Sequence, residues 1–233
     1  MKTTKLAVRI AGLVLAGMMV MAFAGCSGKK SKNADKKIDL KNVKPAPESD
    51  FDYKLTSDEK GVIITGYNTE ANRKNLVIPS AIQELPVVGI ERMNPYGAEA
   101  LVIPEGCKWL APNCFNSIDK LETVVLPESL MFIGRDAFYG DKKIRSITIP
   151  NGVVLDRNVN FDYLKEINLP EEIISNGGRV KSLSECIDGN GEFREVAEKV
   201  KNFKTKKISE EEYDALYEEL KSYGCFGMNY FGY

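Results

Sequence analysis

A short pattern of apolar and polar positions repeats along the middle of the chain. Apolar residues stand at the first, fourth and sixth positions and a proline at the seventh, as in Leu121-Glu-Thr-Val-Val-Leu-Pro127. The pattern recurs in residues 144–150 and 164–170, and in weaker form in 98–104 and 76–79. The closing prolines lie at positions 79, 104, 127, 150 and 170, which gives spacings of 25, 23, 23 and 20 residues. A period in this range predicts a solenoid, in which neighbouring units share one core.

Each copy of the pattern predicts one short β-strand. Apolar residues such as Leu121, Val124 and Leu126 place one face of the strand toward the core. Proline then ends the strand because it has no backbone N–H to donate. Phe115 and Phe138 stand twelve residues before the prolines at 127 and 150. We therefore expect about five neighbouring strands and a buried column of aromatic side chains.

Residues 132–150 carry a family resemblance. They read Phe132-Ile-Gly-Arg-Asp-Ala-Phe138 and end in Ile149-Pro150. This arrangement resembles the BspA-type bacterial leucine-rich repeat, a unit of about 23 residues. The resemblance covers residues 51–175 and implies an α/β, β-rich solenoid, a leucine-rich repeat coil of right-handed sense. The repeat that follows Pro150 departs from the pattern, since it is three residues short and lacks the alanine-phenylalanine pair.

A solenoid needs caps, because each end otherwise exposes apolar core. Residues 51–67 predict an N-terminal β-hairpin cap, with alternating apolar residues in 51–55 and turn residues in 57–61. After Ser175 the period fails. Residues 193–203 predict one amphipathic helix, and Ser209 with Glu212 forms a capping box that begins another. We assign residues 176–233 to a C-terminal helical cap region with an aromatic tail.

The first 25 residues have the composition of an export signal. Lys2, Lys5 and Arg9 form a basic start. The uncharged stretch 10–24 is shorter than the apolar segment that a transmembrane helix usually needs. It ends in Phe23-Ala-Gly-Cys26, which resembles a bacterial lipobox. That resemblance implies a lipidated Cys26 that holds the chain to the membrane of a bacterial cell envelope, facing outside. An ordinary secretory signal cleaved nearby and a transmembrane anchor remain the alternatives.

Residues 26–50 are expected to form a disordered, lysine-rich tether. Five lysines lie between positions 29 and 37, Pro45 and Pro47 follow, and apolar residues are few. The lysines are able to rest against anionic lipid headgroups. We favour a solvated spacer over a specific lipid site.

The composition excludes several kinds of chemistry. The chain has no histidine, which rules out Ser-His and Cys-His nucleophile systems and histidine metal sites. A net charge of −1 is not that of a nucleic-acid binder. Cys107 and Cys114 occupy apolar columns and are interpreted as small hydrophobes. For Cys186 and Cys225 we favour free thiols and keep a disulfide as the alternative. We predict no catalytic residue, no metal and no cofactor.

The outward positions of the predicted strands are the candidate binding site, because solenoids commonly bind partners on such an extended face. They form three ladders: Val77, Val102, Val125, Thr148 and Asn168; Asn75, Ala100, Thr123, Ser146 and Glu166; and Lys74, Glu99, Glu122, Arg145 and Lys165. The candidate ligand-binding residues are Val102, Val125, Thr148, Thr123, Ser146, Glu122 and Arg145. The expected partner is an unknown protein or glycan. The alternative is a solvated face kept soluble by its charges.

Three functions fit these observations. Members of the repeat family are often surface adhesion or interaction proteins, so the resemblance implies a lipid-anchored, non-catalytic binding or adhesion module. An envelope-structural lipoprotein without a dedicated ligand is the first alternative. A hydrolase with its site in the C-terminal region is the second, and the missing histidine argues against it.

Overall fold

A computed structural model gives the fold of the protein. It describes residues 40, 42–141, 143–156, 166–168, 173–175 and 205–224. For residues 146, 166–168, 173–175, 205–207, 210 and 213 it describes the backbone only. The chain divides into two compact units, Met1–Lys37 and Ile38–Tyr233. The first unit, with the predicted export signal and Cys26, lies outside the described residues.

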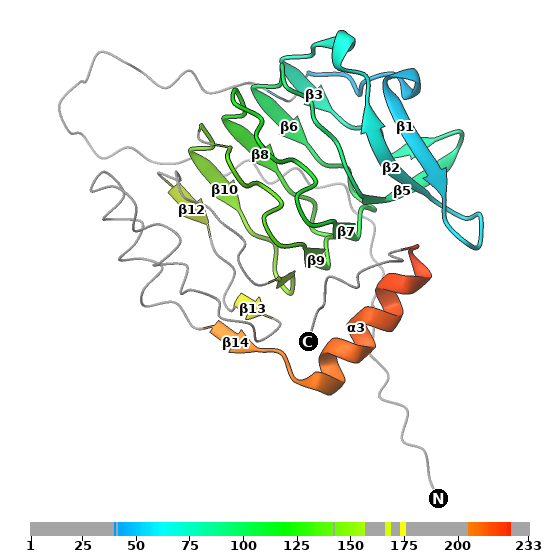
Figure 1. Ribbon diagram of the computed structural model, residues 1–233, viewed down its shortest axis with the longest axis vertical. Coiled ribbons are helices and arrows are strands. Elements are labelled where there is room, and N and C mark those ends of the chain that lie inside the picture. The colour runs from blue at the N-terminus through cyan, green and yellow to red at the C-terminus, as the bar shows by residue number, and fades with distance from the viewer. Residues whose placement is uncertain are drawn as a thin grey trace, which may run out of the picture. The chain divides into compact units, whose positions relative to one another are not determined.

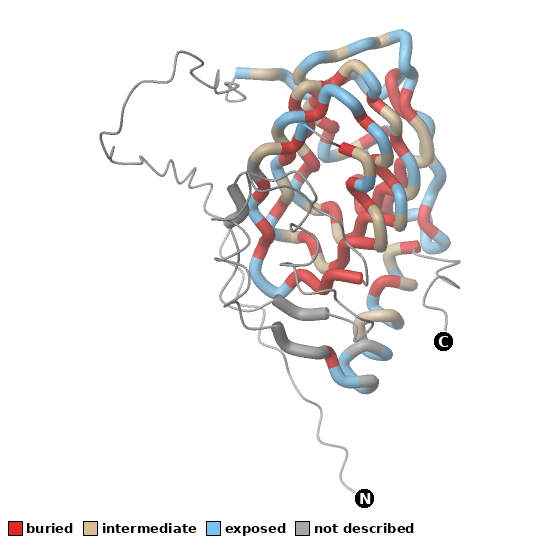
Figure 2. Tube along the Cα trace, turned by 60° about the vertical axis from the view of Figure 1, so that its left-hand side comes forward, coloured by how far each residue is buried: buried red, intermediate tan, exposed pale blue. Residues whose placement is uncertain are grey.

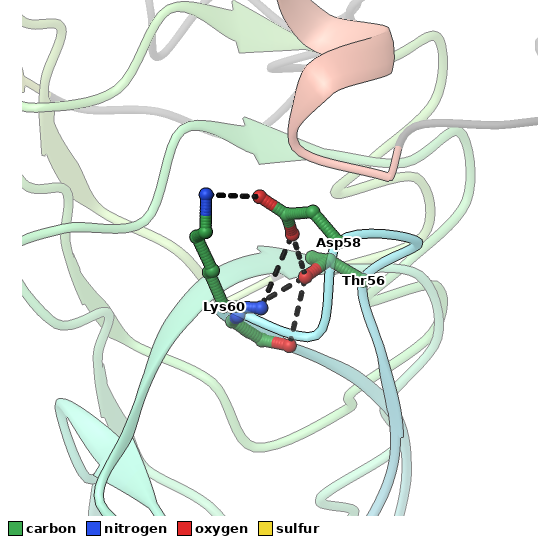
Figure 3. Close-up of polar contacts among 4 residues, drawn as sticks. Thr56, Asp58 and Lys60 are labelled. Carbon is green, nitrogen blue, oxygen red and sulfur yellow. Dashed lines mark hydrogen bonds and ion pairs between the residues drawn. The ribbon is translucent and has the colours of Figure 1, made fainter.

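The predicted N-terminal hairpin is confirmed. Strands β1 (Phe51–Leu55) and β2 (Val62–Tyr67) pair antiparallel, from Phe51 opposite Tyr67 to Leu55 opposite Val62. The turn between them is closed by side chains, as Figure 3 shows. Thr56 Oγ1 donates to Asp58 Oδ1 at 2.7 Å and accepts from the backbone N–H of Gly61 at 3.0 Å. The hydrogen bond from Thr56 lowers the pKa of Asp58, and the backbone N–H of Lys60 acts in the same direction.

The repeats build two sheets that run along the coil. In the described residues, the strands of sheet A follow the order β1, β2, β5, β7, β9, β11, β13 and β14, with β4 attached to β5. Beyond the hairpin these are β4 (Ala81–Ile82), β5 (Leu85–Ile90), β7 (Trp109–Leu110), β9 (Phe132–Ile133), β11 (Val154–Leu155), β13 (Ile173–Ser175) and β14 (Thr205–Lys207). From β7 onward, the described strands of sheet A contain only two or three residues each, and the proline pattern did not reveal them.

Sheet B contains the strands that the proline pattern predicts. Its described strands lie in the order β3, β6, β8, β10 and β12, parallel to one another and side by side in Figure 1. Their bounds are β3 (Asn75–Val77), β6 (Ala100–Val102), β8 (Thr123–Val125), β10 (Ser146–Thr148) and β12 (Glu166–Asn168). Leu76 pairs with Leu101 and Leu101 with Val124, so successive repeats stack in register. The predicted β-solenoid is therefore present.

The core lies between the two sheets, and buried and exposed stretches alternate along the coils in Figure 2. Leu76, Leu101 and Val124 are buried on sheet B, and Leu110 and Ile133 are buried on sheet A. Leu126, which was expected to face inward, is only partly buried and packs against the edge of this core. The predicted aromatic column, Phe115 and Phe138, is also buried.

The turns that join the two sheets also stack. The backbone N–H of Asn113 donates to Arg135 O at 3.0 Å, that of Phe115 to Ala137 O at 3.0 Å, and that of Ser117 to Tyr139 O at 2.8 Å. This row of hydrogen bonds satisfies backbone groups that the strands leave unpaired. These two coils are therefore held together through both sheets and through the turns between them.

Folded chain begins before Phe51, earlier than the predicted end of the tether. Ala46 is buried, and its backbone N–H donates to Val77 O at 2.8 Å on the outer edge of β3. The 3₁₀-turn η1 (Glu48–Asp50) follows, and the buried Asp50 accepts from Arg73 Nε at 2.6 Å. A second 3₁₀-turn, η2 (Thr69–Ala71), precedes β3. The edge strand needs a partner for its backbone, and the last residues of the predicted tether supply one.

The C-terminal prediction is confirmed for one helix. Helix α3 (Glu210–Ser222) begins at Ser209, whose hydroxyl accepts from the N–H of Glu212 while the Glu212 carboxylate accepts from the N–H of Ser209. The predicted helix at 193–203 lies outside the described residues. Strand β14 was not predicted, although it is the last described strand of sheet A. Among the described helices, none has the length and apolar character that crossing a membrane requires.

Candidate functional site

The outward ladders of sheet B are brought together as predicted. Val77 lies opposite Val102 and Val102 opposite Val125, while Thr148 lies opposite Asn168. In the second ladder, Ser146 pairs with both Thr123 and Glu166. Because neighbouring strands lie about 4.8 Å apart, each ladder places one side chain per strand along the coil.

The exposure of these side chains differs along the face. Val125 is 41% exposed and Thr148 is exposed, whereas Val77, Val102 and Thr123 are half-buried. Ser146 belongs to the face by its strand position, and its side chain is not described. Val125 and Thr148 are therefore the most accessible of the candidate ligand-binding residues in the first ladder.

The prediction for Ala100 in the second ladder was wrong. This residue was expected to face outward and is fully buried. Its Cα partners are Asn75 and Thr123. A single methyl group between two longer side chains is shielded by them from solvent. The second ladder is therefore interrupted at β6, where it offers no hydroxyl or amide group to a partner.

A charged row lines the side of the face where the strands begin. Lys74 Nζ lies 2.9 Å from Glu99 Oε1. This hydrogen bond lowers the pKa of Glu99 and raises that of Lys74, and Lys120 and Lys143 lower the pKa of Glu99 further. Glu122 is exposed and Arg145 half-buried. The row carries both signs of charge, so it suits a partner with alternating charges better than a uniformly charged polymer.

Asp141 is a feature that the sequence analysis missed. Its side chain is buried, with the residue only 5% exposed, and its Oδ1 accepts from the backbone N–H of Ile118. Among the described residues, Oδ2 has no hydrogen-bond partner. Burial raises the pKa of Asp141 to about 8, and the nearby Asp119 acts in the same direction. The sequence did contain a signal for this buried position. Asp141 stands nine residues before Pro150, and the equivalent position of the preceding repeat holds the apolar Ile118.

The two central cysteines lie inside the core. Cys107 and Cys114 are buried and free. Burial raises the pKa of Cys107 to about 12 and that of Cys114 well above its usual value. A thiol held in its protonated form is a poor nucleophile and a poor metal ligand. The interpretation of both residues as small hydrophobes fits this environment. Cys186 and Cys225 lie outside the described residues.

The described outward face of sheet B carries apolar, hydroxyl and charged side chains in parallel rows. Such side chains suit contact with another macromolecule. Over the part of the chain that the structure describes, no group of three or more cysteine, aspartate or glutamate side chains is placed to hold a metal ion. The candidate residues lie on backbone held by neighbouring coils. They are therefore fixed in position relative to one another, as a preformed binding surface requires.

Comparison with known sequences finds a similarity in the repeat region. A family profile described as the BspA type leucine rich repeat region matches residues 93–186 in six copies. None of the curated proteins matches this sequence.

Three solved structures are similar to the chain. A leucine rich repeat protein of T. pallidum shares 21% identity over 70% of this chain and 98% of its own, with a TM-score of 0.42. A leucine rich cell surface protein of Faecalibacterium prausnitzii shares 18% identity over 57% of this chain and 45% of its own, with a TM-score of 0.38. A leucine-rich repeat protein of Bacteroides ovatus shares 20% identity over 54% of this chain and 45% of its own, with a TM-score of 0.37. The match spans less than half the length of the last two proteins.

Proposed function

We propose that this chain, whose residues 93–186 are BspA-type leucine-rich repeats, is a lipid-anchored protein of a bacterial cell surface that binds another macromolecule through the outward face of sheet B. The protein is non-catalytic. Its partner is a protein or a glycan, and its fold serves to hold a broad array of side chains in fixed positions.

The observation that carries the proposal is the outward row of β-branched side chains on sheet B. Val125 is exposed, with Val102 on the strand before it and Thr148 on the strand after it. Hydroxyl and charged side chains flank this row. Protein interfaces commonly have an apolar centre surrounded by polar side chains, and this row has the same arrangement. Solenoids commonly bind partners on such a face.

The anchor is the second part of the proposal. The lipobox-like sequence at 23–26 supplies the cysteine, and the lysine-rich residues that follow it supply a solvated spacer. Several acyl chains on Cys26 would hold the protein on the membrane almost permanently, since each buried methylene contributes about 0.8 kcal/mol.

Binding is tested on the compact unit that begins at Ile38. Purified residues 38–233 are immobilised and exposed to a glycan array, to extracellular matrix proteins and to the protein itself. For any partner found, Val125→Lys is expected to weaken binding at least tenfold, because it places a charge in the centre of the apolar row.

Tyr139→Lys is the matched control. Tyr139 is 50% exposed and lies in the turn between β9 and β10, outside the strands of sheet B. A partner that loses affinity for this variant and not for Val125→Lys binds elsewhere, which contradicts the assignment of the face. If no binding were detected to the glycans, to the matrix proteins or to the protein itself, the result would instead favour an envelope-structural lipoprotein without a dedicated ligand.

A further inference from the structure

The outer row of sheet A is apolar and buried. The register places Ile63, Gly89, Trp109, Phe132 and Val154 side by side on successive strands. All five are buried. The alternate row, with Leu110 and Ile133, is buried as well. A sheet exposed on one side would alternate between buried and exposed positions, so both faces of sheet A are covered.

Trp109 shows which element covers this row. Its indole Nε1 donates to the backbone carbonyl of Tyr223 at 3.3 Å, at the end of α3. The indole also lies over Gly89, where a Cβ atom would come within 2.2 Å of the ring. Lys108 adds a cation–π contact, with Nζ 5.8 Å from the centre of the Tyr223 ring. The residue after α3 is therefore held by two interactions, one with Trp109 of β7 and one with Lys108 directly before this strand.

The helix presents its apolar side to the solenoid. Leu220 is fully buried, and Leu216 and Tyr217 are partly buried against the core. The acidic side chains of α3 lie on the opposite side, where Glu211, Asp214 and Glu219 are exposed. Burial of the apolar side, and not helix propensity, is the main source of stability for a helix of this length.

The two ends of α3 meet opposite ends of the solenoid. Its first residues follow β14, the last described strand of sheet A, and the buried Ile208 lies between them. After its last turn comes Gly224, where a Cβ atom would lie 2.7 Å from Ile63 Cδ1 and 3.4 Å from Thr56 Cγ2. Both of those residues belong to the N-terminal hairpin. Six strand intervals separate β14 from β2, about 29 Å, and Figure 1 shows α3 leading back from β14.

We propose that α3, with Tyr223 and Gly224, is a clasp that couples the two ends of the solenoid, so that the N-terminal hairpin and the C-terminal helix open and close together. In a repeat array each unit contacts only its neighbours, and the ends open independently of one another. The clasp adds contacts between segments more than 150 residues apart in the sequence. Release of the helix exposes Trp109 and Ile63, and it removes the cover from the base of the hairpin.

Native-state hydrogen exchange on the full chain tests the coupling. In the wild-type protein, the amides of β1 and β2 and those of α3 are expected to give matching opening free energies, because segments that open as one unit share one opening equilibrium. Leu220→Ala is expected to accelerate exchange in both segments at least tenfold while β6 and β8 keep their protection. Glu219→Ala, on the exposed side of the same helical turn, is expected to change neither.

Three results would overturn the clasp. In the first, α3 exchanges much faster than the hairpin in the wild-type protein, a comparison that holds even if Leu220→Ala does not fold. In the second, Leu220→Ala accelerates exchange in α3 alone. In the third, β8 accelerates together with both ends, which would mean that the variant lowers global stability only.

Discussion

The ring of Phe138 stacks on the ring of Phe115, with centroids 5.5 Å apart and planes inclined by 15°. Both side chains are buried, one from each of two neighbouring coils. Phe138→Ala is expected to lower the free energy of unfolding by about 3–5 kcal/mol, because it removes a buried ring and leaves a cavity beside Phe115. Urea denaturation measures the loss. Tyr139→Ala, which alters a half-exposed ring on the next residue, is expected to change stability by no more than about 0.5 kcal/mol. Equal effects would contradict the aromatic column.

Gly134 lies where two coils come closest. A Cβ atom there would lie 2.4 Å from Pro112 N and 2.6 Å from Ala111 C, and backbone atoms cannot move aside as a flexible side chain does. We expect Gly134→Ala to destabilise the protein by about 1–3 kcal/mol, the usual effect of overpacking. Thermal unfolding provides the measurement.

Gly152→Ala is the comparison for Gly134→Ala. Nothing lies within 4 Å of a Cβ atom at Gly152, whose φ is +75°. In this variant, alanine adopts a strained positive φ but its Cβ atom contacts nothing. We therefore expect the free energy of unfolding to fall by about 1 kcal/mol. A Gly134→Ala protein as stable as the wild type would show that the coils have room to separate at this point.

The buried Asp141 predicts a pH dependence. Its pKa of about 8 in the folded protein lies above the value of 3.8 for a free side chain, so the folded protein holds this proton more tightly than the unfolded chain does. The stabilising contribution is fully present below about pH 4 and is lost as the pH rises through about 8. Asp141→Asn keeps the acceptor for Ile118 and cannot ionise. Its stability relative to the wild type is therefore expected to increase from pH 5 to pH 9.

Chemical denaturation at a series of pH values measures this difference. Ser57→Ala, which removes no ionisable group from an exposed position, serves as the control and is expected to show a nearly constant difference from the wild type. If the advantage of Asp141→Asn stayed constant over the same range, the carboxyl group of Asp141 would not be titrating in the folded protein.

Cys107 and Cys114 are expected to resist alkylation. Their raised pKa values leave very little thiolate at pH 8, and the core shields both sulfur atoms from reagent. Reaction with iodoacetamide should be slower than in denaturant by a factor on the order of a hundred or more. Peptide mass spectrometry after timed labelling reports each residue separately. Rapid labelling of either residue in the folded protein would show that the coils open at this point.

The proposed anchor predicts a covalent modification. In a bacterial host that carries the full chain, Cys26 is expected to incorporate a clickable fatty acid, and the protein is expected to sediment with the membranes. Cys26→Ser should remove the label and release the protein, because the acyl chains provide most of the attachment. Cys225→Ser is the matched control and should behave as the wild type. A labelled Cys26→Ser protein would place the lipid elsewhere.

The periodicity was sufficient to predict sheet B and its register. A proline after each strand and apolar residues at fixed distances before it leave one arrangement in which every repeat buries the same face. Beyond the hairpin, sheet A was not predicted, because its strands from β7 onward contain two or three residues each. Such strands are too short for alternation to be visible, and Trp109-Leu110 and Phe132-Ile133 are apolar at both positions because both faces of this sheet are covered.

Other features depend on contacts between residues far apart in the sequence, which a repeat pattern does not encode. Ala46 was assigned to a tether by its local composition, and its hydrogen-bond partner Val77 lies 31 residues away. The cover over Trp109 comes from Tyr223, 114 residues away. The capping box of α3 was predictable, since Ser209 and Glu212 lie within one turn. Whether Val125 and its neighbours bind a partner stays a prediction.

The hydrogen bond from Ala46 to Val77 has a consequence beyond a single molecule. A parallel sheet with a bare outer strand is a template on which a further strand from another copy is able to add, and repeated addition gives fibres. At β3 that position is already taken by the chain's own residues. Neighbouring copies of the protein would therefore meet a blocked end at β3, and the array is protected there from growing into a polymer.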